Sequence, residues 1–256
     1  DGLEADVVAL AVWPDTDQLR KKGLLSDGWE DRLPNRSLPY TTPIVFVVRK
    51  GNPKGIKAWK DLIQPDIEII TPNPKTSGNG KIAFLSACGS VIVGEGTQEE
   101  AREFVSQIYK RVPVLDTGAR GSTMSFARKG MGDVHLAFES EAHLEVEEAK
   151  GNLEIVWPGL SLLAEPHVAV VDAIVDKRKT RAAAEAYLKF LYTDDGQEII
   201  AKHFYRPMKA EVVERYRDRF PKMTLFSITT IGPDWDEIQA RFFADGALFD
   251  QIYKEK

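Results

Sequence analysis

Cysteine is almost absent from this sequence, because Cys88 is the only one among 256 residues. A single cysteine excludes an intramolecular disulfide and any metal site built from several cysteines. Cys88 lies inside the apolar run 82–93. Apolar surroundings are typical of a buried thiol, so we expect Cys88 to be buried and chemically inert.

Long hydrophobic runs and excess positive charge are also missing. No apolar run reaches the ~18 residues of a transmembrane helix, so we expect no direct membrane insertion. The net charge is -5, which gives no general attraction to nucleic acid or to anionic membrane surfaces. The apolar share of 43% and the charged share of 29% are those of an ordinary globular protein. Nucleic acid is therefore not an expected partner.

Catalytic signatures are absent as well. The four histidines have no HExxH spacing, and neither a Gly-x-Ser-x-Gly elbow nor a P-loop lysine occurs. We expect each histidine to be structural or exposed. The sequence therefore predicts no catalytic residue, no metal, no cofactor and no enzymatic activity.

Apolar runs of strand type alternate with segments of helical periodicity along the chain. We expect strands at 7–12, 44–48, 68–71, 112–115, 134–138, 153–157 and 168–171, and helices at 16–23, 58–63, 82–93, 99–110, 122–129, 141–149, 180–192 and 196–203, with a mostly helical tail over 211–253. The run 7–12 is continuously apolar, as in a strand covered on both faces. The alternation predicts an α/β fold with a largely parallel sheet.

Two junctions between a strand and a helix share one design. Thr76-Ser77-Gly78-Asn79 precedes one helix, and Gly118-Ala119-Arg120-Gly121-Ser122-Thr123 precedes another. Small residues let backbone N–H groups converge there, and the helix dipole adds partial positive charge. Hydroxyl donors would come from Ser77, Ser122 and Thr123. Each junction is compatible with anion binding and equally with an ordinary helix cap.

Several stretches resemble the periplasmic sulfate/thiosulfate-binding proteins of bacterial ABC transporters. The most specific are Thr71-Pro72-Asn73-Pro74-Lys75-Thr76-Ser77-Gly78, Asp116-Thr117-Gly118-Ala119-Arg120-Gly121-Ser122-Thr123 and Ala164-Glu165-Pro166-His167-Val168, with others at 33–35, 47–56, 185–188, 196–198, 205–207, 243–246 and 249–253. The resemblance runs in register along the whole chain. It implies a two-lobed, type II periplasmic binding protein, with residues 1–45 and 169–256 in the first lobe and 46–168 in the second.

The resemblance also implies a function, a location and a ligand set. The chain would work in the periplasm, capture a small oxyanion such as sulfate or thiosulfate, and deliver it to the membrane permease of an ABC importer. Ser77 would donate its hydroxyl and N–H, and Gly78, Asn79 and Ala119 would donate N–H groups. Arg120 would either orient its loop or form a surface ion pair. Molybdate, phosphate and organic sulfonates are the other candidate ligands.

The sequence departs from the family pattern in three places. Phe138 stands where the family has a tryptophan whose indole donates to the anion, which implies weaker binding. Lys81 brings a charge and Asn79 replaces a glycine at the first helix start. The family pattern also begins with a further β-α-β unit that this sequence lacks, so the first lobe would be incomplete. An alternative function is therefore a degenerate or truncated paralogue that keeps the fold as an interaction or sensory module.

Overall fold

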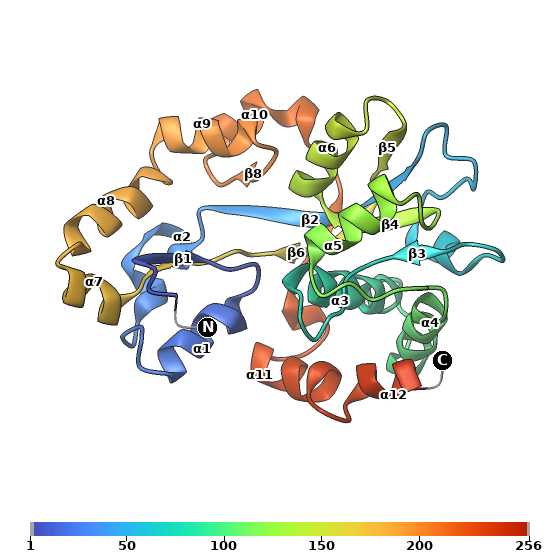
Figure 1. Ribbon diagram of the computed structural model, residues 1–256, viewed down its shortest axis with the longest axis horizontal. Helices are drawn as coiled ribbons and strands as arrows, with labels where there is room; N and C mark the ends of the chain where they lie inside the picture. The colour runs from blue at the N-terminus through green and yellow to red at the C-terminus, as the bar shows by residue number, and fades with distance from the viewer. Residues whose placement is uncertain (1–2, 255–256) are drawn as a thin grey trace. The chain divides into compact units, whose positions relative to one another are not determined.

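The computed structural model describes residues 3–254, which form two compact units (Figure 1). Unit 1 comprises Asp1–Thr42 and Ala164–Phe220, and unit 2 comprises Pro43–Leu163 and Pro221–Lys256. The sequence placed 221–256 with the first lobe, so this division differs from the expected one in that segment. No helix within residues 3–254 combines the length and the apolar character that crossing a membrane requires.

Unit 2 is built around the long strand β2, Tyr40–Arg49. Its sheet has the order β3-β4-β2-β6-β9, and β5 also pairs with β2. The other strands are β3 (Ile69–Ile70), β4 (Val134–Phe138), β5 (Leu153–Val156), β6 (Leu160–Ala164) and β9 (Thr224–Phe226). Strand β2 runs antiparallel to β4 and β5, whereas the β3–β4 and β6–β9 pairs are parallel. The expected α/β class is confirmed, but the expectation of a largely parallel sheet is wrong.

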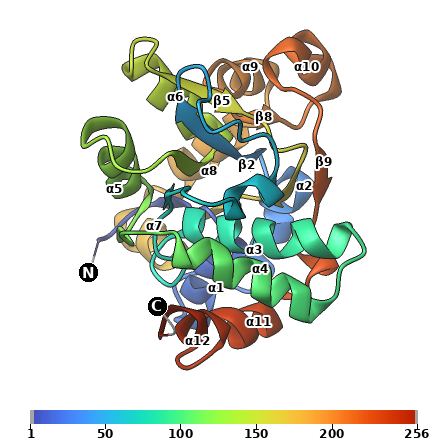
Figure 2. The ribbon, with the colours of Figure 1, turned by 90° about the vertical axis from the view of Figure 1, so that its right-hand side faces the viewer.

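The helices of unit 2 pack against this sheet and against each other. They are α3 (Gly78–Val93), α4 (Gln98–Lys110), α5 (Ala119–Thr123), α6 (Glu139–Glu148), α11 (Trp235–Ile238) and α12 (Leu248–Lys254), with 3₁₀ turns at Trp59–Ile63 and Ile228–Thr230 and π-helical turns at Met124–Arg128 and Gln239–Phe243. Helix α3 lies alongside α4 (Figure 2). No strand forms at 112–115, where one was expected.

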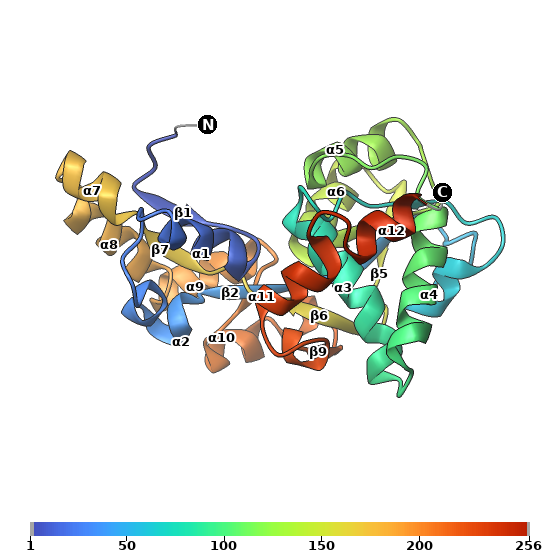
Figure 3. The same cartoon turned by 90° about the horizontal axis from the view of Figure 1, so that it is seen from below.

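Helix α3 is buried on all sides, because nearly every residue from Asn79 to Gly89 is apolar or small. Phe84 packs against four aromatic rings at centroid distances of 5.3–6.2 Å, those of Tyr109, Phe242, Phe243 and Phe249. Three of these rings belong to the C-terminal segment, whose helix α12 also contacts α4 (Figure 3). These contacts explain why residues 221–254 belong to unit 2. Cys88 is buried in α3 as expected, and burial raises its pKa to about 12.

Unit 1 has a much smaller sheet. It consists of β1 (Val7–Ala9) and β7 (Val168–Val170), paired antiparallel. Separately, β8 (Arg206–Pro207) pairs with the first residues of β2 at the end of the larger sheet. Its helices are α1 (Trp13–Lys21), α2 (Pro34–Ser37), α7 (Asp172–Arg178), α8 (Arg181–Phe190), α9 (Asp194–Lys202) and α10 (Ala210–Arg215), with 3₁₀ turns at Trp29–Arg32 and Arg217–Arg219. Its core cluster contains Leu25, Trp29, Ala169 and Val171. Strand β1 is only half-buried, so the expectation of a strand covered on both faces is wrong.

Candidate functional site

The start of helix α3 carries three of the residues that the sequence singled out. Ser77 is the N-cap, has extended backbone angles, and accepts a hydrogen bond from the Gly80 N–H through Oγ at 3.3 Å. The Lys81 N–H donates to the Ser77 carbonyl at 2.9 Å. The Ser77 N–H donates to the Asn73 carbonyl at 2.9 Å, so the expectation that this N–H serves the anion is wrong and only the Ser77 hydroxyl is left for a ligand. Because the first N–H groups of a helix have no partner within it, those of Gly78 and Asn79 remain open. Among the described residues, no acceptor engages either of these two groups.

The side chain of Asn79 fixes this helix start to strand β4. With its amide oriented so that each atom meets a suitable partner, Asn79 donates to the Leu136 carbonyl at 3.1 Å and accepts from the Phe138 N–H at 2.9 Å. The side chain is therefore used for structure, which leaves the backbone N–H of Asn79 for a ligand. The sequence had not indicated this side-chain role, because both partners are backbone groups about 60 positions away.

Gly80 lets the preceding loop approach the first turn of α3. A Cβ atom at this position would lie 2.5 Å from the Pro72 carbonyl oxygen and 2.9 Å from the Asn73 carbonyl. Contacts that short occur only if the backbone moves. Glycine is therefore required here for the loop to close over the helix start.

The second predicted helix start lies beside the first. The Asn73 N–H donates to the Asp116 carbonyl at 2.8 Å, and Thr76 Oγ1 donates to the Thr117 carbonyl at 2.9 Å. These bonds join the loop before α3 to the loop before α5, which begins at Ala119. The structure thus brings the Ser77–Asn79 and Ala119 segments together within unit 2.

Two buried polar atoms lie at the start of α5 without a partner among the described residues. They are Ser122 Oγ and Asp116 Oδ2. Ser122 is fully buried in the first turn of the helix, where the sequence had predicted a hydroxyl donor. Gly121 lets Asp116 pack against this turn, since a Cβ on Gly121 would lie 2.9 Å from the Asp116 Cβ.

Phe138 is the last residue of β4 and is buried. Its neighbour Ala137 packs into the core cluster with Phe126 and Ala142. Side chains alternate across a strand, so Phe138 points to the face opposite Ala137, while its backbone N–H donates to the Asn79 side chain at 2.9 Å. The backbone of Phe138 is therefore joined to the α3 start, and its side chain carries no hydrogen-bond donor.

Arg120 lies on the first turn of α5 and is exposed. Among the described residues no ion pair of Arg120 within 4.0 Å is found, so of the two roles left open for it the structure does not show a surface ion pair. It lines a cavity of about 170 Å³ together with residues of α6, among them Glu141 and Glu145. Its side chain is not part of the α3 start.

Lys75 joins the loop before α3 to the C-terminal segment through two ion pairs that the sequence did not predict. Lys75 Nζ contacts Asp245 Oδ1 at 2.8 Å and Asp250 Oδ2 at 2.9 Å. The hydrogen bonds that Lys75 donates to Asp245 and Asp250 raise the pKa of Lys75, and the bond to Asp250 lowers the pKa of that carboxyl. The partners are about 170 positions apart, and only the family resemblance at 243–246 and 249–253 had marked that segment.

The site contains oxygen and N–H donors but no metal ligands. Within residues 3–254, no group of three or more His, Cys, Asp or Glu side chains could hold a metal ion. The arrangement is suited to binding a small anion at the positive end of a helix.

The chain matches the family of bacterial extracellular solute-binding proteins over residues 1–206. It is 50% identical to the sulfate-binding protein of Salmonella typhimurium over 256 residues, covering 99% of this chain and 78% of the relative. It is 47% identical to the thiosulfate-binding protein of Pseudomonas aeruginosa, covering 99% of this chain and 77% of that relative.

A solved structure agrees with these matches. The sulfate-binding protein from Mycobacterium tuberculosis has a TM-score of 0.86 at 31% identity, covering 95% of this chain and 83% of that one. This similarity confirms the expected fold of a type II periplasmic binding protein. On the sequence match and the fold together, the chain belongs to the family of bacterial extracellular solute-binding proteins.

Proposed function

We propose that this chain is the solute-binding component of an ABC importer and captures a tetrahedral oxyanion, with sulfate or thiosulfate preferred. The observation that carries the proposal is the open start of α3, where the N–H groups of Gly78 and Asn79 have no acceptor among the described residues. Relatives of about 50% identity are named for binding sulfate and thiosulfate.

The donors suit a small dianion. A hydroxyl can accept and donate at once, so Ser77 Oγ can keep its bond from Gly80 while it donates to the ligand. Ala119 adds an N–H from the neighbouring loop. Aligned backbone dipoles replace the hydration of the anion without a counter-charge. This design is consistent with a protein of net charge -5.

In this proposal the protein works in the periplasm and docks on the permease subunits of the importer. It binds and releases the anion without covalent chemistry. Phe138 offers no donor, so sulfate should bind less tightly than at an equivalent site with an indole donor.

Isothermal titration of the purified chain with sulfate, thiosulfate and molybdate tests the proposal. Micromolar or tighter binding of at least one oxyanion is the expected result. The variant Ser77→Ala should weaken that binding about ten- to hundredfold, because a hydrogen bond to a charged ligand is lost.

Ser90→Ala is the matched control, since Ser90 lies in the last turn of the same helix and donates to the Ala87 carbonyl. It should leave the affinity unchanged. Circular dichroism checks that both variants fold. If no oxyanion produces heat, the proposal fails, and the alternative of a fold retained as an interaction or sensory module is favoured.

A further inference from the structure

Unit 1 contains a cavity of about 230 Å³ that the proposed anion site does not use. Its wall is formed by Trp29, Arg32, Leu33, Glu185, Lys189 and strand β7. One side is apolar, with Leu33 and the valines of β7, and the other side carries charged groups. A concave, mostly apolar site with a few fixed polar groups is the usual form of a small-molecule site.

The turn that carries Arg32 and Leu33 is held in an unusual conformation. The three residues that follow Pro34 all have positive φ angles, 52° at Asn35, 56° at Arg36 and 61° at Ser37. The buried Ser37 hydroxyl donates to the carbonyls of Trp29 and Glu30 at 3.3 and 2.9 Å. Left-handed backbone is costly for residues other than glycine, so a run of three is kept only where the surrounding contacts enforce it.

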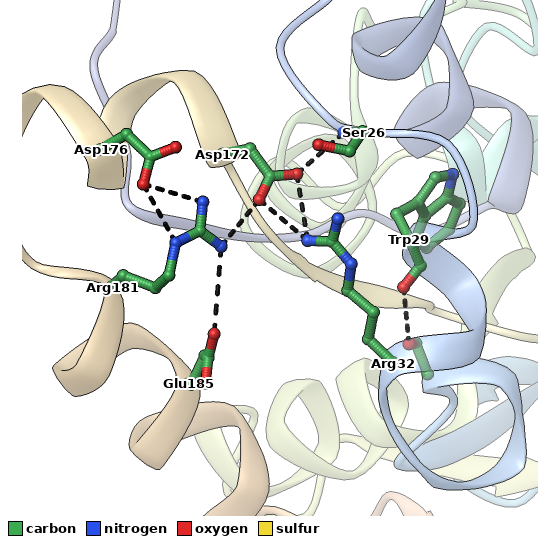
Figure 4. A network of polar contacts seen from close by, with 8 residues as sticks. Ser26, Trp29, Arg32, Asp172, Asp176, Arg181 and Glu185 are labelled. Atoms are coloured by element: carbon green, nitrogen blue, oxygen red, sulfur yellow. Dashed lines mark hydrogen bonds and ion pairs between the residues drawn. The ribbon is translucent and has the colours of Figure 1, made fainter.

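The guanidinium of Arg32 is anchored at one end only. Its Nη1 donates to the two oxygens of Asp172 at 2.8 and 3.1 Å (Figure 4). Among the described residues, its Nε and Nη2 have no acceptor. Arg32 therefore lines the cavity, is held in place by Asp172, and keeps N–H donors that no described residue uses.

The anchoring carboxylate is shared. Asp172 also accepts from Arg181 Nη1 at 2.8 Å and from the Ser26 N–H at 2.8 Å, while Arg181 has a second carboxylate in Asp176 (Figure 4). Arg32 thus shares its only counter-ion with Arg181. Arg181 Nη1 also lies 3.9 Å from Glu185 Oε1, so three carboxylates balance the two arginines, and Arg32 offers the cavity unused N–H donors rather than unbalanced charge (Figure 4).

The remaining charged wall adds one more cation. Lys189 Nζ lies 3.5 Å from Glu185 Oε2 on the next turn of α8, and both side chains are largely exposed. An ion pair of this kind is weak in water, so Lys189 can turn toward a ligand at little cost.

We propose that the unit 1 cavity binds a small monocarboxylate with a short aliphatic chain. The carboxylate accepts from the free N–H groups of Arg32, in the paired geometry that guanidinium groups favour, and Lys189 adds a second cation. The aliphatic chain lies on Leu33 and the valines of β7. This binding is independent of the oxyanion site in unit 2.

Titration of the purified chain with three probes tests the inference by calorimetry or ligand-observed NMR. Hexanoate has both a carboxylate and an alkyl chain. Acetate has the carboxylate without the longer chain, and 1-hexanol has the chain without the carboxylate. Hexanoate should bind with a Kd of about 1 mM or tighter. Acetate should bind about two-hundredfold more weakly, because it lacks four methylenes that contribute about fourfold each. Hexanol should bind at least about tenfold more weakly, because it lacks the charge.

Three variants separate the contribution of the charged residues from that of the apolar residues. Arg32→Gln should weaken hexanoate binding at least about tenfold. Its control Arg36→Gln should have no effect, because Arg36 lies four positions away, pairs with Glu30 and does not line the cavity. Leu33→Ala keeps every charge, and it should weaken hexanoate binding without changing that of acetate.

The inference is overturned if hexanoate does not bind, if acetate binds as tightly as hexanoate, or if Arg36→Gln is as damaging as Arg32→Gln. Ser77→Ala should leave hexanoate binding intact. The inference therefore stands or falls separately from the proposed oxyanion site.

Discussion

The sheets of the two units are built from similar β-branched residues but are covered to very different degrees. In unit 2, the residues of β2 from Thr41 to Val48 are buried, and β4 is buried along its whole length. In unit 1, β1 is a three-residue strand whose side chains are half-buried or exposed. The free energy of unfolding should therefore depend strongly on apolar packing in unit 2. In unit 1 it should depend more on the ion network around Asp172.

The largest expected effect comes from the aromatic cluster of unit 2. Phe84→Ala should lower the free energy of unfolding by about 3–5 kcal/mol, because the ring is buried among four others. Phe190→Ala is the control, since that side chain on α8 is exposed, and its cost should be under about 1 kcal/mol. Urea unfolding followed by circular dichroism measures both. If both substitutions lowered the free energy of unfolding equally, the aromatic cluster of unit 2 would not have the stabilising role given to it.

An intermediate effect is expected from Asp172 in unit 1, and it should depend on pH. Burial alone would raise the pKa of this carboxyl, but hydrogen bonds from Arg32, Ser26 and Arg181 outweigh it and lower the pKa to about 2. A pKa below that of the unfolded chain means that the stabilisation is present above about pH 4 and is lost as the pH falls toward 2.

Asp172→Asn should therefore cost about 1–2 kcal/mol at pH 5 after allowance for solvent screening, and nearly nothing near pH 2. Asp218→Asn is the control, because its carboxylate is fully exposed. Urea unfolding at pH 5, 3 and 2 gives the difference between variant and parent at each pH. A difference that stays constant with pH would contradict the role given to the ion network.

The smallest effect is expected from β1 itself. Val8→Ala should cost under about 1 kcal/mol, because the side chain is only half-buried. The same substitution at Val47, which is fully buried in β2, should cost about 2–3 kcal/mol. The pair compares the two sheets directly by urea unfolding. A Val8→Ala cost equal to that of Val47→Ala would show that β1 is covered as well as β2.

Local patterns predicted most elements, and long-range pairing accounts for the errors. Helix α3 was predicted from its apolar run, and β4 was predicted at 134–138, where all five residues prove to be buried. Strand direction could not be read from periodicity, because it depends on which distant segments meet. The missed strand β6 and the wrongly expected strand at 112–115 have the same cause, since pairing partners decide whether an extended segment becomes a strand.

The site was predicted in part. Ser77, Gly78, Asn79 and Ala119 were chosen from helix-start chemistry and family resemblance, and the structure places them at the starts of α3 and α5, whose preceding loops are hydrogen-bonded to each other. The hydrogen bonds of the Asn79 side chain to β4 and the ion pairs of Lys75 could not be predicted, because each joins the site to a segment distant in sequence. The role of these residues as anion ligands stays a prediction.

The pairing of β1 with β7 has a consequence for synthesis in the cell. Val7 pairs with Val170, so 163 residues must be added after Val7 before its partner exists. At a translation rate of about 5–20 residues per second, β1 waits roughly 8–30 s with its backbone unpaired. Unpaired apolar strands are aggregation-prone, so this interval is the period in which a nascent chain most needs protection by chaperones.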